Sequence, residues 1–441
     1  MPDSLKLGLA GLGTVGAGVL RLIDTHADQI AARTGRPVEV LAISARNRNK
    51  KRDADTDSYR WVDDPIALAQ DPEIDVFVEL MGGEEGIPKE AVEAALKAGK
   101  HVVTANKALL AHHGVALAKL AEANNVALNF EAAVAGGIPV VKVMRESLQG
   151  NDITRVYGIL NGTCNYILTL MQEEGATFED ALKDAQEKGF AEADPTFDIG
   201  GFDSAHKLAL LTSLAFGVET AFDQIYVEGI DRIAAADIEA AERLGYRLKL
   251  LGVAAATESG IEQRVHPAMV AKHTPIAETF GAQNCVLIEG DFVEDVMLSG
   301  QGAGAGPTAS AVMSDIIELA RGHIFAPFAT RAENLKPCRR SEMGIHAGSY
   351  YLRLTVHDQI GVIAGIATRM AEQNISLESI VQHRQRTDIP GVDDGEEPTG
   401  PVDVVMITHE TTEAAIQKAL AAIEGDGHVV AKPQMIRIES L

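Results

Sequence analysis

The feature that most constrains this chain is a glycine-rich turn close to its start. A short apolar segment beginning at Lys6 runs into Gly11-Leu-Gly13-Thr-Val-Gly16, which has the pattern GxGxxG. In such a motif the first glycine makes a tight turn, the second lets a pyrophosphate approach the backbone, and the third lets a helix pack on the strand. The helix expected to begin at Thr14 and Val15 would point its unpaired N–H groups and the positive end of its dipole at the phosphates. Because an amphipathic helical pattern follows, dinucleotide binding is favoured over a purely structural turn.

The end of the expected second strand favours NADP over NAD. This strand covers residues 38–43, and NAD sites usually carry a carboxylate at its end that binds the ribose hydroxyls. Here the chain reads Ser44-Ala-Arg46 instead, and a guanidinium at this position would attract a 2′-phosphate and stack on the adenine. A solvated basic loop is the alternative, because four more basic residues follow: Arg48, Lys50, Lys51 and Arg52.

The composition is typical of a globular protein with more than one domain. The chain has 441 residues, enough for two or three domains with buried cores. No apolar run reaches the roughly 18 residues of a membrane helix, and the first strand begins too early for a signal peptide. A formal charge of −24 argues against nucleic-acid or anionic-membrane partners. Unrelated cysteine spacings predict a cytoplasmic protein without disulfides, and no Cys/His cluster has zinc-ligand spacing; the cysteines are Cys164, Cys285 and Cys338.

The order of the expected elements predicts an α/β protein with three domains. Strands alternate with helices up to about residue 130, which is typical of a Rossmann-type parallel sheet. We expect this dinucleotide-binding domain to cover 1–135, and we expect a later segment, 302–330, to return to it. Residues 136–301 mix helices and strands, as in an α+β substrate-binding and dimerisation domain. After a polar linker at 331–348, residues 349–441 have the βαββαβ order of a ferredoxin-like unit, with an acidic loop at 387–400.

A second motif, between Gly189 and Lys207, combines several acids with one lysine. Asp203 and Lys207 are four residues apart in an expected helix and therefore share one face. An exposed ion pair beside a helix-capping aspartate is the ordinary explanation of such spacing. However, the neighbouring Leu208 indicates a semi-buried lysine, and the preceding loop has no basic residues to pair with its acids. Such carboxylates suit a substrate ammonium group, and a semi-buried lysine suits proton exchange with an alcohol. The three acids of the loop are Glu192, Asp194 and Asp198.

The segment from Ala185 to Lys207 resembles the signature of homoserine dehydrogenases. Four other segments resemble the same family, in the family's order: Thr104–Lys107, Glu131–Pro139, Gly158–Leu168 and Gly302–Ser310. The similarity extends over residues 5 to 325, and the C-terminal unit resembles an ACT domain. The resemblance implies an NAD(P)-dependent oxidoreductase that acts on a CH–OH group and interconverts L-homoserine and L-aspartate 4-semialdehyde. It further implies a place in threonine, methionine and isoleucine biosynthesis, and a homodimer or homotetramer.

The resemblance also implies roles for individual residues. Lys207 would be the general acid/base, Asp203 its positioning partner, and Glu192 the site of the homoserine ammonium group. The remaining substrate contacts would be Asp198, Gly162, Thr163 and Lys107. The cofactor would be lined by Thr14, Val15, Lys107, Gly189 and Gly302. These residues join Gly11, Gly13 and Gly16 of the glycine motif and Arg46, which the sequence itself indicates. A monovalent cation, expected to be Na⁺, would be held by one carboxylate and nearby main-chain carbonyls, which fall on Glu131, Val134, Gly136 and Ile138.

Three positions depart from the usual pattern of the family. Phe190 stands where many relatives have tyrosine, Cys164 replaces a common threonine, and the segment ending at Gln301 lacks the usual aromatic residues. These departures bear on affinity and fine geometry more than on the class of reaction.

The C-terminal unit has a candidate regulatory site of its own. Asp358 and Gly361 lie where a helix is expected to begin, and Asn374 precedes the next strand. Asp358 could cap this helix, while Gly361 leaves space for a small ligand at its N-terminus. In ACT domains the matching loop and asparagine often bind an amino acid, so threonine is the candidate allosteric effector. A dimerisation module without a ligand is the alternative.

Two other functions stay open from the sequence. A phosphorylating semialdehyde dehydrogenase would need a thiolate nucleophile, for which Cys164 is the candidate near the expected pocket. A non-catalytic sensor could combine a nucleotide-binding domain with an amino-acid-binding module. The combination of acids with Lys207 argues against the sensor, because a sensor does not need a proton-transferring lysine.

Overall fold

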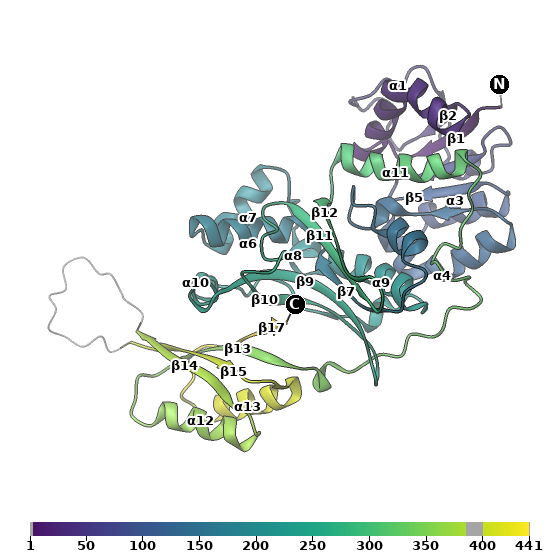
Figure 1. The fold of residues 1–441 in the computed structure, drawn as a ribbon. Helices are drawn as coiled ribbons and strands as arrows, with labels where there is room; N and C mark the ends of the chain where they lie inside the picture. Colours follow the sequence, from purple (N-terminus) through teal and green to yellow (C-terminus); the bar gives the residue numbers. More distant parts are fainter. Residues whose placement is uncertain (1–2, 385–399, 441) are drawn as a thin grey trace.

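The computed structural model describes residues 3–384 and 400–440 of the chain (Figure 1). The acidic loop expected at 387–400 therefore lies, except for its last residue, outside the described residues. The protein is a mixed α/β molecule built on two sheets, one of six strands and one of eleven.

The N-terminal sheet has the strand order β3-β2-β1-β4-β5-β6, and its strands pair in parallel. This is the order of a Rossmann fold, in which a dinucleotide binds at the reversal between the first and fourth strands. The strands are β1 Leu5–Ala10, β2 Val38–Ser44, β3 Arg60–Trp61, β4 Val76–Glu79, β5 His101–Thr104 and β6 Leu128–Asn129. The helices are α1 Thr14–Thr34, α2 Pro65–Ala69, α3 Ile87–Lys97 and α4 Lys107–Ala123. The expected Rossmann-type domain is confirmed.

A late helix, α11 (Ala305–Ala320), returns to this N-terminal domain and packs against α1 (Figure 1). Its apolar face shares a buried cluster with the first strand, in which Val312 and Ile316 join Leu7 and Leu9. This arrangement puts the end of the central part of the chain next to the glycine-rich turn.

The central part of the chain forms an antiparallel sheet in the order β12-β11-β7-β9-β10. Its strands are β7 Ile153–Ile159, β9 Tyr246–Thr257, β10 Gly260–Ala271, β11 Gln283–Gly290 and β12 Glu294–Gln301, with the short β8 Tyr226–Val227 on β10. Its helices are α5 Val140–Lys142, α6 Gly162–Glu174, α7 Phe178–Glu187, α8 Thr196–Ile199, α9 Phe202–Phe216 and α10 Ala235–Leu244. Helix α9 is buried along most of its length and packs on β7, β9 and β10.

The C-terminal unit has the expected βαββαβ order. Its elements are β13 Ala347–Val356, α12 Val362–Glu372, β14 Leu377–Arg384, β15 Val402–Thr408, α13 Glu413–Gly425 and β17 Gln434–Glu439, with the short β16 Thr411–Thr412 on β13. The two helices pack against each other over one face of this sheet (Figure 1).

The last strand, β17, joins the C-terminal unit to the central sheet, which the sequence pattern did not predict. It pairs antiparallel with β13 and parallel with β10, so the two sheets become one. The polar stretch before β13 is also less free than a linker, because Lys336 bridges to Val218 and Arg340 bridges to Ile261. The C-terminal unit is thus bound to the central sheet through main-chain hydrogen bonds.

Candidate functional site

The glycine-rich turn between β1 and α1 has the geometry that a bound dinucleotide requires. Gly11 has φ +102°, and a Cβ there would lie 2.3 Å from the Leu80 carbonyl oxygen. A Cβ on Gly16 would lie 2.1 Å from the Gly11 oxygen, whereas one on Gly13 would meet nothing within 4 Å. The first and third glycines are therefore needed for packing, and the second leaves open space at the N-terminus of α1. Thr14 and Val15 form the first turn of that helix.

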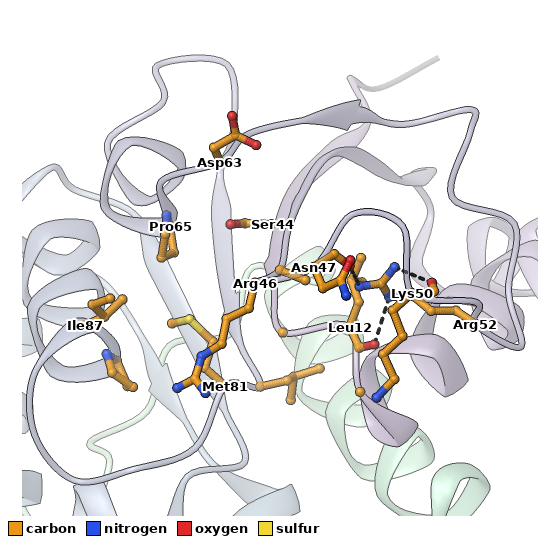
Figure 2. Close-up of a pocket in the computed structure, with 15 residues that line it drawn as sticks. Leu12, Ser44, Arg46, Asn47, Lys50, Arg52, Asp63, Pro65, Met81 and Ile87 are labelled. Atoms are coloured by element: carbon orange, nitrogen blue, oxygen red, sulfur yellow. Dashed lines mark hydrogen bonds between the residues drawn. The ribbon is translucent and has the colours of Figure 1, made fainter.

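A cavity of about 480 Å³ adjoins this turn beyond the ends of β1, β2 and β4 (Figure 2). Its lining includes Gly11, Gly13, Ser44, Arg46, Asn47 and Lys50. The exposed guanidinium of Arg46 makes no hydrogen bond or ion pair with the residues that the structure describes. A charged group on the wall of the cavity is thus available to a ligand.

The other arginines of the basic loop have structural roles. The Arg52 Nε donates a hydrogen bond to the Leu12 carbonyl at 3.1 Å, and its Nη1 donates to the Lys50 carbonyl at 2.8 Å (Figure 2). The guanidinium groups of Arg48 and Arg52 lie 5.5 and 5.4 Å from the centre of the Trp61 ring. Within this basic loop, Arg48 and Arg52 therefore make structural contacts. Arg46 lines the cavity without such contacts.

Two lysines from different parts of the fold share one carboxylate. The Lys207 Nζ donates to Asp203 Oδ2 at 2.7 Å and to the Leu160 carbonyl at 2.7 Å. The Lys107 Nζ lies 3.1 Å from the other oxygen, Asp203 Oδ1. Asp203 and Lys207 are on α9 of the central domain, and Lys107 begins α4 of the N-terminal domain. The cluster therefore lies where the dinucleotide-binding domain meets the central domain.

Asn161, which sequence reasoning missed, connects the two aspartates of the cluster. Its Nδ2 donates to Asp198 Oδ1 at 2.9 Å and to Asp203 Oδ2 at 2.8 Å. Its Oδ1 accepts the Cys164 N–H at 2.8 Å, as the N-cap of α6. An asparagine directly before a helical pattern is the available signal, but it indicates only the cap.

The charges around the cluster determine the protonation states of its acids. Burial alone would raise the pKa of Asp203, but Lys207 and Lys107 outweigh burial and hold this pKa well below its usual range. Burial, followed by the charge of Asp203, raises the pKa of Asp198. The Asp203 carboxylate also raises the pKa of Lys107 against the effect of burial. At neutral pH Asp203 is thus ionised and Lys107 is charged.

The loop from Gly189 to Asp198 provides the more open side of the site. Glu192 is exposed, and its main-chain carbonyl accepts a hydrogen bond from the Gln186 side chain at 3.0 Å. Gly189 has φ +76° and is exposed. The Thr163 hydroxyl donates to the Phe190 carbonyl at 2.7 Å, and the Phe190 ring packs on Tyr166. The structure therefore does not bring the Glu192 carboxylate into the hydrogen-bonded cluster around Asp203.

Two glycines of the expected site are close-packed. A Cβ on Gly162 would lie 2.6 Å from the Ala282 carbonyl oxygen. A Cβ on Gly302 would lie 2.1 Å from the Asn284 Cγ. Neither position has room for a larger side chain, so packing alone requires glycine at both.

The environment of Cys164 does not favour a thiolate nucleophile. The side chain is fully buried, and its Sγ lies 3.2 Å from the Asp198 carbonyl oxygen. Burial, with added effects of Asp198 and Asp203, raises the thiol pKa well above its ordinary value. A catalytic cysteine needs the opposite shift, so this geometry argues against the phosphorylating dehydrogenase.

Glu131 is a buried carboxylate beside the turn that contains Val134, Gly136 and Ile138. Its two oxygens accept the N–H groups of Val141 at 2.9 Å and Lys142 at 2.8 Å. Burial and the nearby Asp315 raise its pKa to about 8. Gly136 has φ +55°, and a Cβ there would lie 2.3 Å from the Gly302 carbonyl oxygen. Within the described part of the chain, no group of three or more His, Cys, Asp or Glu side chains is arranged to hold a metal ion.

In the C-terminal unit the N-cap position of α12 is Gly361, with φ +92°, and not Asp358. A left-handed cap suits glycine, and it places Asp358 three residues before the helix boundary. Asp358 Oδ1 instead accepts a hydrogen bond from Gln382 at 3.4 Å. A Cβ on Gly361 would meet nothing within 4 Å, and Asn374 adopts φ +58° after the helix. The N-terminus of α12 is therefore open at Gly361.

Among the residues of 3–384 and 400–440, no helix is both long and apolar enough to cross a membrane.

Comparison with known proteins identifies all three parts of the chain. The model of the homoserine dehydrogenase NAD-binding domain matches residues 11–131, that of homoserine dehydrogenase matches 139–317, and that of the ACT domain matches 350–425. A homoserine dehydrogenase of Pseudomonas aeruginosa is 43% identical, with 99% of each chain covered.

Solved structures agree with these matches. A crystal structure of a homoserine dehydrogenase from Thiobacillus denitrificans has a TM-score of 0.91 and 41% identity, covering 99% of this chain and 98% of that chain. A hyperthermophilic archaeal homoserine dehydrogenase in complex with NADPH has a TM-score of 0.63 and 26% identity, covering 73% of this chain and 99% of that chain. With its Rossmann-type sheet, its lysine–aspartate cluster and these full-length matches, the chain belongs to the homoserine dehydrogenase family of oxidoreductases.

Proposed function

We propose that the protein is an NADP-preferring enzyme that interconverts L-homoserine and L-aspartate 4-semialdehyde in threonine, methionine and isoleucine biosynthesis. The observation that carries this proposal is the pair of lysines on Asp203. Their ammonium groups lie 2.7 and 3.1 Å from the two oxygens of one buried carboxylate, where the dinucleotide-binding and central domains meet.

The cluster is suited to proton transfer. The nicotinamide cofactor, when bound, would supply the hydride in the reduction and accept it in the oxidation. During reduction Lys207 would donate a proton to the aldehyde oxygen, and during oxidation it would take the proton from the hydroxyl. Asp203 and the Leu160 carbonyl orient the Lys207 ammonium, which makes Asp203 its positioning partner. Lys107 would contact both the substrate and the nicotinamide side of the site.

The acids and the close-packed glycines would form the remaining substrate pocket. Glu192 would bind the substrate ammonium group from the exposed loop, and this role requires the loop to close towards Asp203. Asp198 would complete the pocket with Gly162 and Thr163. The fit is supported by charge, because Asp198 brings a second carboxylate to the two lysines through Asn161, and the exposed Glu192 would add a third from the loop.

Arg46 would bind the 2′-phosphate of NADP, while Gly11, Gly13, Gly16, Gly189 and Gly302 would line the cofactor with Thr14 and Val15. The unpaired Arg46 guanidinium beside the cavity supports NADP over NAD, and the archaeal family member was solved with NADPH.

We expect Arg46→Ala to raise the KM for NADPH about tenfold or more, because a charge-assisted contact is lost. The KM for NADH should not rise. Arg33→Ala, an exposed change at the far end of α1, is the control. Equal losses with both cofactors would exclude a 2′-phosphate role.

One assay tests the activity as a whole. Oxidation of NADPH is followed with aspartate semialdehyde, with and without threonine, and is repeated with NADH. Turnover that depends on the semialdehyde supports the proposal. Its absence in folded protein would reject the proposed reaction.

Glu131 and the carbonyls of Val134, Gly136 and Ile138 would hold a monovalent cation, with Na⁺ the first candidate. A buried carboxylate whose pKa is raised to about 8 gains from any neighbouring positive charge. The positive-φ turn at Ala135 and Gly136 can direct carbonyls towards it. At pH 8, NaCl should raise the melting temperature above that in choline chloride at equal ionic strength, and Glu131→Gln should remove the difference.

The C-terminal ACT domain would bind threonine near Asp358, Gly361 and Asn374 and regulate the enzyme. We further propose the domain division 1–135 with 302–330, then 136–301, a connection at 331–348, and 349–441. A homodimer or homotetramer in the cytoplasm is proposed as well, and the three free cysteines fit a reducing compartment.

A further inference from the structure

His206 is a buried histidine whose ring makes no hydrogen bond to the described residues. It directly precedes Lys207 on α9 and is only 5% exposed. Neither ring nitrogen has a hydrogen-bond partner within residues 3–384 and 400–440. A buried polar ring without partners is costly, so its place needs an explanation other than hydrogen bonding.

Three aromatic rings pack against His206, those of Phe222, Phe197 and His112. The His206 ring stacks on Phe222, with ring centres 4.3 Å apart and planes at 21°. It also packs against Phe197, with centres 5.5 Å apart. Phe222 begins a short 3₁₀ turn, Phe222–Gln224, and Phe197 belongs to α8 in the substrate-side loop. One histidine thus connects the rigid α9 to the loop that carries Asp198.

The same group of rings reaches the second lysine of the cluster. The Lys107 Nζ lies 5.9 Å from the centre of the Phe197 ring, within the range of a cation–π contact. His112, on the same helix as Lys107, is 5.5 Å from His206 and 4.9 Å from Phe222, ring centre to ring centre. The contacts therefore cross from the central domain to α4 of the dinucleotide-binding domain.

We propose that His206 is a positioning residue whose ring, packed on Phe222, holds the Phe197 ring against the Lys107 ammonium and so sets the place of Lys107 for substrate. This inference rests on the proposed substrate role of Lys107. Asp203 holds Lys107 through one oxygen only, and the Phe197 face is the second contact that restricts the flexible lysine stem.

The charge state of His206 agrees with this role. Burial, with His112 and Lys107 on α4 as further causes, lowers its pKa to about 4, against smaller effects of Asp203 and Glu84. The ring is therefore neutral at neutral pH. A neutral ring can stack beside Lys107 without repelling it, and stacking does not require either nitrogen.

The test compares His206→Leu, which keeps burial but loses the flat ring, with His206→Phe, which keeps the ring but loses both nitrogens. For His206→Leu we expect the KM for homoserine to rise about fivefold, with the KM for NADP and the melting temperature close to wild type. His206→Phe should restore the homoserine KM. A wild-type KM in His206→Leu, or an equally raised KM in both variants, would overturn the proposal. His26→Leu, an exposed histidine on α1, is the matched control.

A double-mutant cycle separates this role from a general packing defect. Phe197 is 44% exposed, so Phe197→Leu should fold normally and raise the homoserine KM by a similar factor. If His206 acts through Phe197, the double variant should be little worse than either single variant. Effects that multiply would overturn the proposal.

A readout that does not need turnover keeps this inference separate from the proposed function. Acetic anhydride labelling of Lys107 is measured by peptide mass spectrometry relative to Lys119, which is on the same helix and 53% exposed. His206→Leu should raise the Lys107/Lys119 ratio about twofold, and His206→Phe should not. An unchanged ratio in His206→Leu would overturn the positioning role, whereas wild-type protein without homoserine turnover would reject the proposed function instead.

Discussion

At the scale of single residues, the buried cluster between the two domains depends on how the Asp203 carboxylate is shared. Asp203 is 5% exposed, and each of its oxygens faces a lysine. The Asn161 amide links this carboxylate to Asp198, so two lysines and two aspartates meet where the two domains pack. In the proposed reaction, the Lys207 ammonium would stabilise the negative charge that develops on the substrate oxygen.

Removal of Lys207, the lysine proposed to transfer the proton, should greatly lower turnover without disturbing the cofactor site. We expect Lys207→Ala to lower kcat by at least about a hundredfold, because no other group is hydrogen-bonded to both Asp203 and the Leu160 carbonyl in the described chain. NADPH binding, measured by fluorescence titration, should be unchanged. Lys119→Ala is the control on an exposed face of α4, and near-normal kcat in Lys207→Ala would refute the assignment.

Glu131 should make stability depend on pH in a specific window. Its pKa is raised from 4.5 to about 8 in the folded protein, so between these values the folded state holds a proton that the unfolded state has lost. Its contribution is therefore fully present below pH 4.5 and is lost as the pH rises through about 8. In sodium-free buffer, the melting temperature of Glu131→Gln should rise relative to that of the wild type as the pH increases across this window. A constant difference would contradict the shifted pKa.

At the scale of elements, the C-terminal strand β17 holds the ACT unit on the central sheet. Its hydrogen bonds to β10 are reinforced by ion pairs of Glu439, which accepts from Arg264 at 2.8 Å and from Arg155 at 2.8 Å. Arg264 is 3% exposed. Burial would raise the pKa of Glu439, but these arginines and His266 hold it well below its usual range.

Loss of this buried charge should destabilise the joint between the two sheets. We expect Glu439→Gln to lower the free energy of unfolding by about 2 kcal/mol, because it removes one of the two carboxylates that pair with the buried Arg264, the other being Glu262. The effect should be full above the ordinary glutamate pKa of 4.5 and should fade as the pH falls below it. Denaturant unfolding at pH 7 and pH 4 measures the loss of stability and its pH dependence. Glu410→Gln, at an exposed position, is the control. An equal loss for both variants would show that the ion pairs contribute nothing.

At the scale of the whole molecule, one continuous sheet connects the ACT domain to the cluster around Asp203. The order β17-β10-β9-β7 leads from the C-terminal unit to the strand that ends just before Leu160. The Leu160 carbonyl accepts the Lys207 hydrogen bond at 2.7 Å. A ligand whose affinity for the ACT domain differs between two conformations of the protein would thus have a structural connection to Lys207.

Threonine inhibition is the corresponding measurement. We expect threonine to lower turnover, and Asn374→Asp to raise the inhibition constant about tenfold, because a carboxylate in place of the amide repels the effector's own carboxylate. Aspartate tolerates the φ of +58° found at Asn374. Asn125→Asp is a matched control, since Asn125 has φ +54° and is exposed on the dinucleotide-binding domain. Equal inhibition of both variants would place the effector elsewhere.

Much of this protein follows from its sequence because the determining interactions are local. The GxGxxG turn, the alternation of strands and helices, and the βαββαβ order of the last unit depend on residues a few positions apart. The pairing of Asp203 with Lys207 is also local, since four residues make about one helical turn. Even the capping asparagine before α6 carried a readable signal, although only for the helix.

Tertiary structure alone decided the rest. Lys107 meets Asp203, Asn161 bridges two aspartates, and β17 adds a strand to β10 only because whole domains pack in one arrangement. Such contacts join residues far apart in the chain, so local periodicity and propensity do not predict them. The same holds for His206, because its packing on Phe222 and Phe197 beside Lys107 is not indicated by any local sequence pattern.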